Sequence, residues 1–427
     1  MGSEARISDS RTGHTAAALT GTAYDVERIR ADFQILFREV HGKPLVYLDS
    51  GASAQKPSSV LEAMDHAYRF EYANVHRGLH HLSNVATDHF EAARETVRRF
   101  LNAGSAEEII FTRNATSSIN LIARTFGELE IEAGDEIVLS IMEHHANIVP
   151  WHFLRETRGA VLKWLPMTDQ GELRLDQLDQ MLTKKTKIVA ITHMSNVLGT
   201  VNPVKDIIRI AHAKGIPVLV DGSQAAVHMG VDVRDLDADF YVFTGHKTYG
   251  PTGIGVLYAK KRHLEALPPY EGGGDMIETV TVDRVTYNKP PHKFEAGTPA
   301  IVEAIGLGAA LNYMMQVGRE KIARHEAEIA AYAGERLAAL PWLTLHGTAP
   351  GKGAIFAFTI DGLHPHDIST IIDRSGVAVR AGHHCAQPLM ERLGVTATCR
   401  ASFAMYSTKG EVDALVTALT KAHDLFA

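Results

Sequence analysis

The central part of the chain alternates short apolar runs with helical stretches, and this alternation limits the folds that it can adopt. The runs are rich in Val, Ile and Leu; they are EIIFT (108–112), EIVLSI (136–141), AVLKWL (160–165), KIVAIT (187–192), IPVLVD (216–221), DFYVFT (239–244) and GIGVLYA (253–259). Strands this apolar are buried on both faces, which is typical of a parallel sheet covered by helices on either side. The sequence therefore predicts an α/β domain built on a mostly parallel seven-stranded sheet.

A different pattern begins near residue 303 and predicts a second, smaller domain. A long helical stretch over 303–340 precedes alternating strand-like and helical segments, whose apolar runs are AIFAFTI (354–360), GVAVR (376–380) and TCRASFA (398–404). We expect a flexible N-terminus over 1–20, a large domain over 21–305 and a smaller α+β C-terminal domain over 306–427. The helical pattern TAYDVERIRADFQILFREV is expected to form an N-terminal helix that packs on the small domain.

Charge and cysteine content exclude several kinds of partner. The net charge of −7 argues against nucleic acid or an anionic membrane as the main partner. Two cysteines are too few for a disulfide framework, which fits a reducing compartment. No apolar run approaches the roughly 18 residues that a spanning helix needs, and the N-terminus lacks the apolar core of a secretory signal. We therefore expect a cytoplasmic protein that binds neither nucleic acid nor membrane.

Polar residues cluster directly after five of the predicted strands. They are Asn114-Ala115-Thr116, Glu143-His144-His145, His193-Met194-Ser195-Asn196, Asp221-Gly222-Ser223-Gln224 and Thr244-Gly245-His246-Lys247. In a doubly wound sheet, ligands bind at the carboxyl ends of the strands, where such residues meet. The sequence therefore predicts that these clusters line one site.

Two ionisable residues of this set each allow two interpretations. Lys247, in the Gly- and Pro-rich stretch VFTGHKTYGPTG, is either a solvated surface lysine or a Schiff-base lysine in a partly desolvated site. The neighbouring Thr244 and His246 could bind a phosphate, which favours the second interpretation. Asp221, at the end of IPVLVD, is either a helix N-cap or the carboxylate that keeps a pyridine ring nitrogen protonated.

The other polar residues are equally ambiguous one by one. Thr116 either caps a helix or binds a phosphate at its N-terminus, and His144 either stacks on a flat ring or is an ordinary loop residue. Asn196 and Gln224 could hydrogen-bond a ring hydroxyl. In this order along the chain, a phosphate cup, a stacking histidine, an aspartate and a lysine together indicate pyridoxal phosphate as the cofactor.

The segment RAGHHCAQPLM (380–390) contains Cys385, which is a metal ligand, a buried filler or a nucleophile. Zinc sites favour spaced ligands, and three consecutive residues rarely converge on one ion, so we predict no metal site. The flanks are polar and include a turn, which disfavours an inert buried thiol. The only other cysteine, Cys399, lies in an apolar run and is expected in the core.

Five segments of the chain resemble one known family. EHHANIVPW, VDGSQA, TGHKTYGPTGIG, EAGTPA and RAGHHCAQPLM are similar to the SUF-type (group II) cysteine desulfurases of the class V aminotransferase group. The resemblance runs from Leu48 to Tyr406. It implies a fold-type I pyridoxal phosphate transferase that forms a homodimer with its active site at the subunit interface.

The resemblance also implies residue roles. Lys247 would hold the cofactor, Asp221 would pair with its ring nitrogen, and His144 would stack on the ring and take part in catalysis. Thr298 of EAGTPA would reach the phosphate of the neighbouring subunit, and His76 and Arg77 of NVHRG match a motif near the dimer's active site. The remaining cofactor contacts would be Gln224, Asn196, Thr116, Thr244 and His246, and the substrate contacts Arg400, Asn196, Arg380 and Arg77. Two departures from the family pattern are Thr244, where serine is common, and Ser407, where asparagine is usual.

The implied reaction is removal of sulfur from L-cysteine, giving L-alanine and a Cys385 persulfide for iron–sulfur cluster assembly. A small sulfur-acceptor protein of the SUF type would take the persulfide sulfur. Arg380 and a protonated His383 or His384 are hypothesised to favour the attacking thiolate. The alternatives are selenocysteine lysis, an aminotransferase or kynureninase-like activity, and a non-catalytic scaffold in a sulfur-transfer assembly.

Overall fold

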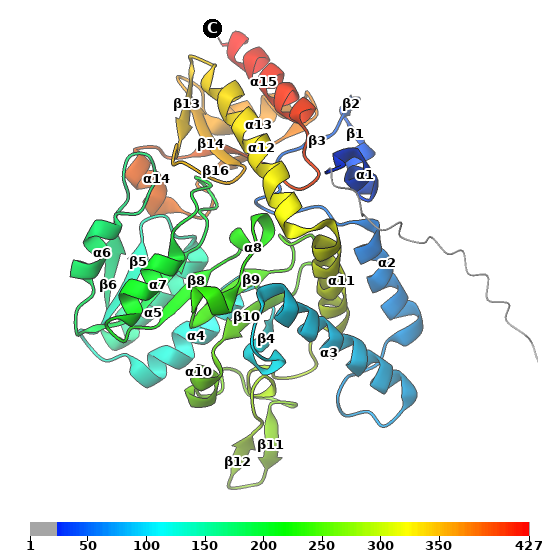
Figure 1. Cartoon of the computed structure of the whole chain (residues 1–427), viewed down its shortest axis with the longest axis vertical. Helices are drawn as coiled ribbons and strands as arrows, with labels where there is room; N and C mark the ends of the chain where they lie inside the picture. Colours follow the sequence, from blue (N-terminus) through cyan, green and yellow to red (C-terminus); the bar gives the residue numbers. More distant parts are fainter. Residues whose placement is uncertain (1–23, 427) are drawn as a thin grey trace, which may run out of the picture.

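The computed structural model describes residues 24–426, so the flexible N-terminus predicted over 1–20 lies outside the described residues. The largest sheet has seven strands in the order β4-β10-β9-β8-β7-β5-β6 (Figure 1). Their bounds are β4 Ile109–Thr112, β5 Glu136–Ser140, β6 Val161–Leu165, β7 Thr186–Thr192, β8 Val218–Asp221, β9 Phe240–Thr244 and β10 Gly255–Ala259. Strand β10 is antiparallel to β4 and β9, and the other neighbouring pairs are parallel. The predicted mostly parallel seven-stranded sheet is confirmed.

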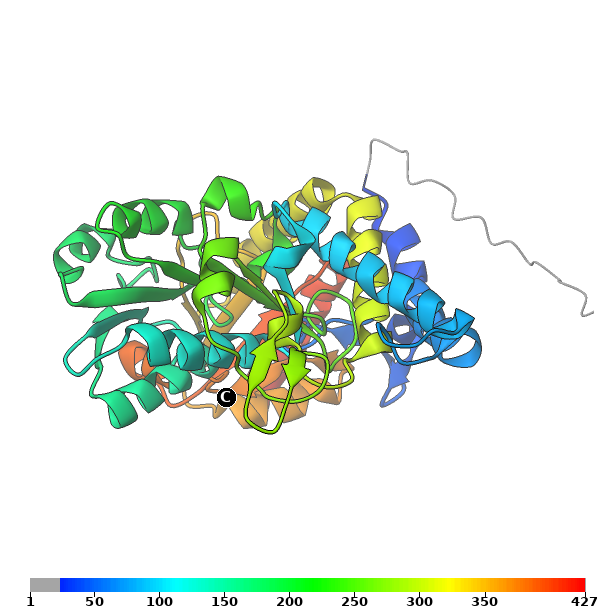
Figure 2. The ribbon, with the colours of Figure 1, turned by 90° about the horizontal axis from the view of Figure 1, so that it is seen from below.

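Helices cover both faces of this sheet (Figure 2). Val218 and Val220 of β8 pack in one core with α3, α6, α7 and α11, whereas Leu219 between them packs in another with α4, α5 and α10. Alternate side chains of a strand point to opposite faces, so a strand buried on both must be apolar throughout. The bounds are α3 His81–Leu101, α6 Leu175–Met181, α7 Val204–His212, α11 Ile301–Val317, α4 Ala115–Glu130, α5 Val149–Arg158 and α10 Lys261–Ala266.

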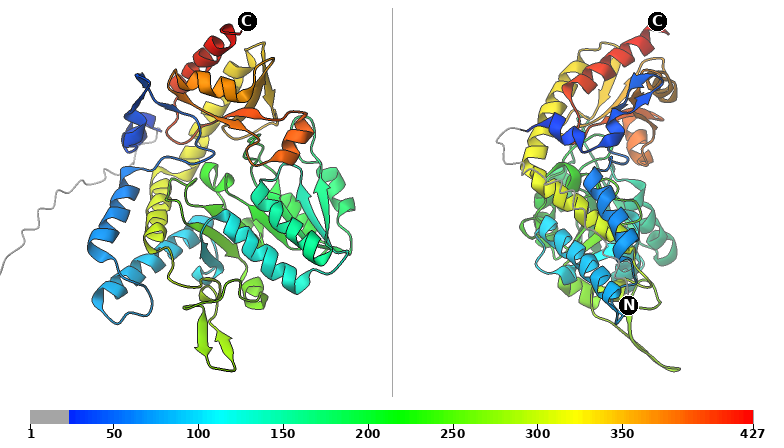
Figure 3. Two further views of the ribbon diagram at one scale, coloured as in Figure 1. Left: turned by 180° about the vertical axis from the view of Figure 1, so that it is seen from behind. Right: turned by 90° about the vertical axis from the view of Figure 1, so that its right-hand side faces the viewer.

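The C-terminal part forms a second layer around a four-stranded antiparallel sheet of order β13-β14-β17-β16 (Figure 3). Helices α12, α13 and α15 contribute apolar side chains to its core. The bounds are β13 Leu343–His346, β14 Ile355–Ile360, β16 Arg380–Gly382, β17 Thr398–Ser402, α12 Arg319–Ala338, α13 Pro365–Asp373, α14 Gln387–Leu393 and α15 Lys409–Asp424.

The predicted continuous helix over 303–340 is wrong, because Gly318 divides it into α11 and α12. Gly318 has φ of 98° and ψ of 109°, a conformation that is costly for residues with a Cβ. Helix α11 packs along α3 and α2 (Ser58–His66) of the large domain, and the small domain's layer begins with α12 (Figure 1). Side chains of α12 belong to both cores, Ile322 to that of the large sheet and Ile329 and Ala333 to that of the four-stranded sheet, so α12 joins the two layers.

The N-terminal segment lies against the C-terminal layer. Strand β3 (Val46–Tyr47) pairs in parallel with β15 (Val377–Ala378), and Arg30 of α1 (Val26–Ala31) forms a 3.1 Å ion pair with Glu411. The helix predicted over 22–40 is shorter than expected, because α1 ends at Ala31; Phe33, two residues later, is buried in the core.

The remaining regular elements are short. Two of them, β11 and β12, form a hairpin that projects from the body (Figure 1). The bounds are β1 Glu39–Val40, β2 Lys43–Pro44, α8 Ala225–His228, α9 Val233–Leu236, β11 Ile277–Val280 and β12 Val285–Tyr287. Among the helices of residues 24–426, none has the length and apolar composition that crossing a membrane requires.

A substitution at Gly255 tests how closely the sheet presses on α4. A Cβ at this position would lie 2.4 Å from the backbone carbon of Asn114 and 2.9 Å from the amide nitrogen of Ala115. We expect Gly255→Ala to reduce folding stability by about 1–3 kcal/mol, because neither backbone atom can move without displacing the helix. Thermal unfolding measures the loss, and Gly272→Ala, whose Cβ meets nothing within 4 Å, is the matched control. Equal melting temperatures for the two variants would contradict the expectation.

Candidate active site

A cavity of about 420 Å³ lies at the carboxyl ends of the parallel strands, beneath the C-terminal layer. The residues predicted for the site that line it come from both domains; they are Thr116, His144, Asn196, Asp221, Gln224, Thr244, His246, Lys247, Arg380, Cys385 and Arg400. The five strand-end clusters are brought to one place because parallel strands end at the same edge of the sheet. The C-terminal layer adds Arg380 and Arg400 from its sheet and Cys385 from the loop before α14.

Lys247 follows β9 and lies inside this cavity rather than on the solvated surface. Burial lowers the pKa of its ammonium to about 8, despite the opposing attraction of Asp221. A lysine with this pKa has a much larger share of neutral, nucleophilic amine near neutral pH than an exposed lysine has. The geometry therefore favours the Schiff-base interpretation.

Asp221 ends β8 and is 6% exposed. Its Oδ1 accepts hydrogen bonds from the backbone N–H of Ser223 at 3.0 Å and from the Ser223 hydroxyl at 2.6 Å. Helix α8 begins at Ala225 with Gln224 as its N-cap, so Asp221 is not the cap of that helix. The arrangement leaves a fixed, buried carboxylate that faces the cavity.

Two neighbouring groups form a pocket suited to a phosphate. Thr116 lies in the first turn of α4, whose N-cap is Asn114; the Asn114 side chain accepts from the N–H of Ser117 at 2.9 Å. Thr116 is therefore not the cap, and its hydroxyl lies beside a helix N-terminus. Thr244, which lines the same cavity, is 3% exposed and its hydroxyl oxygen has no partner within the described chain.

The cavity histidines are neutral. Burial lowers the pKa of His144 to about 3, with Lys247 adding to the effect, and burial lowers the pKa of His246 to about 4. The Nδ1 of His144 accepts from the N–H of Ala146 at 3.0 Å, so in the neutral ring the proton lies on Nε2. A neutral, fixed imidazole suits stacking on a flat ring better than a mobile charged one.

The side-chain amides of Asn196 and Gln224 each donate one hydrogen bond within the chain. The Asn196 amide nitrogen donates to the carbonyl of His384 at 2.8 Å, and the Gln224 amide nitrogen donates to the carbonyl of Gly51 at 2.8 Å. The buried amide oxygen of Gln224 has no partner among residues 24–426. That oxygen is free to accept from a hydroxyl of a bound ring.

Arg400 and Arg380 are held by a residue that the sequence did not point to. Asp49 lies 3.3 Å from Nη2 of Arg400 and 2.9 Å from Nη2 of Arg380. Arg400 also donates to the carbonyl of Asn196 at 2.9 Å, which joins the small domain to the end of β7. No local pattern marks Asp49, because its partners lie more than three hundred residues away. The two guanidinium groups form a fixed cationic wall suited to a carboxylate.

A second residue without a predicted role, Glu143, joins two strands beneath the cavity. Its buried carboxylate accepts from the Asn147 amide at 2.7 Å and from the N–H of Thr192 at 2.9 Å, and burial raises its pKa to about 8. These contacts fix the loop that contains His144. In the sequence, Glu143 stands in the strand-end cluster that contains His144, and its residue type alone did not indicate a role.

Cys385 is exposed at the edge of the cavity, on a loop of unusual backbone. His384 and Cys385 have φ of 52° and 54°, in the left-handed region that non-glycine residues rarely adopt. The N–H of His145 donates to the Cys385 carbonyl at 2.6 Å, which holds the loop to the segment after β5. His384 is buried, bonds to Thr398 at 2.9 Å, and has its pKa lowered to about 3 by burial. The hypothesis that a protonated His384 favours the thiolate is therefore wrong, whereas Arg380 and Arg400 both lie near enough to Cys385 to interact with its charge.

Three predicted residues lie outside this cavity. Thr298 lines a separate cavity of about 210 Å³, whereas Arg77 pairs with Asp275 at 2.7 Å and His76 with Glu91 at 2.9 Å. Within one chain, therefore, the structure does not bring Thr298, Arg77 or His76 to the other site residues.

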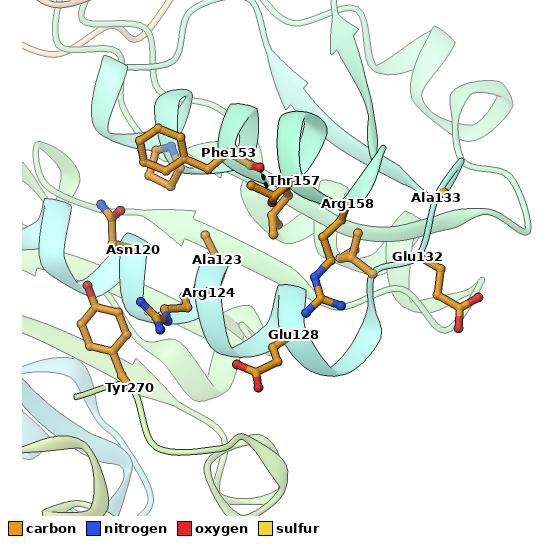
Figure 4. Close-up of a pocket in the computed structure, with 13 residues that line it drawn as sticks. Asn120, Ala123, Arg124, Glu128, Glu132, Ala133, Phe153, Thr157, Arg158 and Tyr270 are labelled. Carbon is orange, nitrogen blue, oxygen red and sulfur yellow. Dashed lines mark hydrogen bonds between the residues drawn. The ribbon is translucent and has the colours of Figure 1, made fainter. Parts of the chain in front are cut away.

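Another cavity, of about 930 Å³, is larger than the one that contains Lys247 and lies between α4 and α5 (Figure 4). Arg124 and Glu128 line it from α4, and Phe153 and Arg158 from α5. It includes neither Lys247 nor Cys385, and none of the predicted site residues. Size alone does not identify the active site here.

Comparison with known proteins agrees with this geometry. The family model of the class-V aminotransferases matches residues 46–415. The chain belongs to the class-V aminotransferase family. It is 54% identical to a cysteine desulfurase of Enterobacter sp. (strain 638), over 94% of this chain and 99% of that protein. It is 51% identical to a probable cysteine desulfurase of Halalkalibacterium halodurans, over 95% of this chain and 98% of that protein.

A solved structure extends the family agreement to three dimensions. The crystal structure of the cysteine desulfurase CsdA from Escherichia coli, in an S-sulfonic acid form, superposes with a TM-score of 0.87 at 41% identity. The superposition covers 94% of this chain and 99% of that chain. The predicted fold-type I architecture is thereby confirmed.

The residues of the cavity fit pyridoxal phosphate. The buried hydroxyl of Thr244 and the buried amide oxygen of Gln224 lack partners in the described chain, as groups awaiting a phosphate and a ring hydroxyl would. Asp221 would supply a carboxylate for the ring nitrogen, and Lys247 would supply an amine for the aldehyde. The donor set thus matches each polar group of the cofactor.

The lowered pKa of Lys247 predicts how cofactor uptake depends on pH. Only the neutral amine attacks an aldehyde, so we expect the rate of cofactor uptake by apoenzyme to rise with pH and to level off above about 8. At pH 7 about a tenth of the amine would be neutral. Absorbance of the bound cofactor measures the rate, and Lys205→Arg, at an exposed lysine outside the cavity lining, is the control variant. A midpoint near the ordinary lysine value of 10.5 would contradict a desolvated Lys247.

Proposed function

We propose that this chain is a pyridoxal phosphate-dependent cysteine desulfurase in which Cys385 receives the sulfur of L-cysteine as a persulfide, leaving L-alanine. The activity agrees with the names of its full-length relatives, and the cofactor with the family. The observation that carries the assignment is that one cavity contains both a desolvated lysine, Lys247, and an exposed thiol, Cys385. An aminotransferase reaction requires the lysine but not the thiol.

Each residue of the cavity has a separate role in the proposed reaction. When bound, pyridoxal phosphate withdraws electrons from the amino acid and so makes its sulfur open to attack. Arg400 and Arg380 bind the substrate carboxylate. The Lys247 amine, once released, moves the proton at Cα, and Asp221 keeps the ring nitrogen protonated. The Cys385 thiolate forms a bond to the substrate sulfur as the carbon–sulfur bond breaks, and the carbon takes up a proton to give alanine.

We further propose a homodimer in which Thr298 and Arg77 serve the site of the neighbouring copy. Both lie outside the cavity of their own chain, although the resemblance assigns them to an active site. The exposure of Cys385 supports delivery of the persulfide to a small SUF-type acceptor protein for iron–sulfur cluster assembly. The cytoplasm fits this role, since a persulfide carrier needs a reducing compartment.

Two alternative functions would require different groups in the cavity. A non-catalytic scaffold would not need Lys247, Asp221 and Cys385 to face one another, and these side chains do share one cavity. Selenocysteine lysis uses the same cavity but depends less on the thiol, because a selenol leaves more readily.

Cys385→Ala separates these functions. We expect the variant to lose sulfide and alanine production from L-cysteine by at least about a thousandfold, because no nucleophile remains for the sulfur. Cofactor absorbance should stay at the wild-type level. Cys399→Ala, which removes the buried thiol instead, should keep activity within a few fold of wild type. Undiminished desulfuration by Cys385→Ala would overturn the persulfide assignment.

A further inference from the structure

Three side chains meet at the outer edge of the cavity in a group that the reaction does not explain. A ring nitrogen of His145, a ring nitrogen of His383 and the Cys385 sulfur all lie within 4.8 Å of one another. Cys385 lines the cavity, whereas the two histidines lie outside it, and His383 and Cys385 are both exposed. Among residues 24–426 no other group of His, Cys, Asp and Glu side chains converges in this way.

The backbone holds this group together. The Cys385 carbonyl accepts from the N–H of His145 at 2.6 Å, which fixes the thiol loop against the segment after β5. His383 Nδ1 accepts from the N–H of Cys385 at 3.1 Å, and His145 Nε2 accepts from the N–H of Gln387 at 3.1 Å. The two imidazole rings lie 5.5 Å apart, tilted by 34°. The ligand atoms are therefore preorganised rather than brought together by chance on a mobile surface.

The chemistry of the group selects the ion. Two imidazole nitrogens and a thiolate are ligands that zinc prefers, and three protein ligands leave its fourth tetrahedral position open. Calcium and magnesium need oxygen ligands, which this group lacks. We propose that His145, His383 and Cys385 bind Zn²⁺ and that the metal reversibly blocks the thiol. The site itself does not depend on the proposed function, but its inhibitory effect rests on Cys385 being the sulfur carrier.

Binding and sulfur transfer exclude each other because both use the same sulfur atom. On binding, the Cys385 thiol releases its proton to solvent and its thiolate bonds to zinc, with no change of oxidation state. The backbone N–H groups of Cys385 and Gln387 hold the two rings by hydrogen bonds, which are much weaker than the bond between zinc and an imidazole nitrogen.

The proposed site contradicts the prediction of no metal site in RAGHHCAQPLM, and the reason is which residues converge. Of the consecutive residues His383, His384 and Cys385, the middle one turns inward to Thr398 and takes no part. Its place is taken by His145, which lies 240 residues from Cys385 in the sequence (385 − 145). The expectation that three consecutive residues do not converge on one ion is consistent with this geometry, and the third ligand comes from another domain.

The test measures protection of the thiol by zinc sulfate in the reduced, full-length holoenzyme. Alkylation of Cys385 by iodoacetamide is followed by mass spectrometry while buffered free zinc is raised, without L-cysteine, which would chelate the metal. We expect zinc to slow alkylation at least tenfold with one zinc bound per chain, and a chelator to restore the rate. Cys399, which is buried, serves as the internal reference.

Variants locate the site. His383→Asn and His145→Gln keep an oxygen that can accept from the backbone N–H, so the loop stays in place, but each removes a zinc ligand. Each should weaken protection by at least about tenfold, since even partners beyond the metal ligands are worth that much. His81→Asn, at an exposed histidine elsewhere, should behave as wild type.

The outcomes are decisive. Absence of protection at one zinc per chain, equal protection in the ligand variants, or protection by Cu(I) but not by Zn²⁺ would overturn the zinc site. Protection in a protein that forms no alanine from L-cysteine would leave the site standing and remove the proposed function. Alanine formation from L-cysteine without protection of the thiol by zinc would support the proposed function and overturn the zinc site.

Discussion

The hydrogen bond from the His145 N–H to the Cys385 carbonyl is the contact on which the site's chemistry depends. It joins a loop of the small domain to the carboxyl end of a large-domain strand. The bond from the Asn196 amide to the His384 carbonyl, 2.8 Å long, repeats this connection at the next strand of the sheet. Together they keep a thiol within the cavity that contains Lys247, although Cys385 and Lys247 belong to different layers of the structure.

Desolvation gives the cavity its reactivity. It lowers the pKa of Lys247 to about 8, and it keeps His144 and His246 neutral. The remaining positive charge is concentrated in Arg380 and Arg400, which Asp49 holds in position. The cavity thus combines a lysine that loses its proton more readily than an exposed lysine with a fixed cationic wall, which is what an amino acid substrate with a carboxylate requires.

The exposed Cys385 thiol can react with a sulfur acceptor, but it can also bind metal ions. A persulfide must reach an acceptor, so Cys385 lies at the surface, where metals can also reach it. His145 and His383 lie beside the thiol and, in the proposed site, bind zinc together with it. Availability of free zinc would then limit how much of the enzyme can transfer sulfur, without any change in the cofactor pocket.

The roles of Lys247, Asp221 and Cys385 are implied by a family resemblance and proposed from the cavity that they share. The sequence by itself determined the sheet and the strand-end clusters. These are local properties: apolar runs report burial on both faces, and parallel strands end at one edge. The tertiary structure decided the rest. Gly318 divides a helix whose pattern looked continuous, and Asp49 meets arginines more than three hundred residues away. His384 became a neutral buried residue while His145 took a place beside Cys385, because only the packed chain fixes which histidine is desolvated and which faces the thiol.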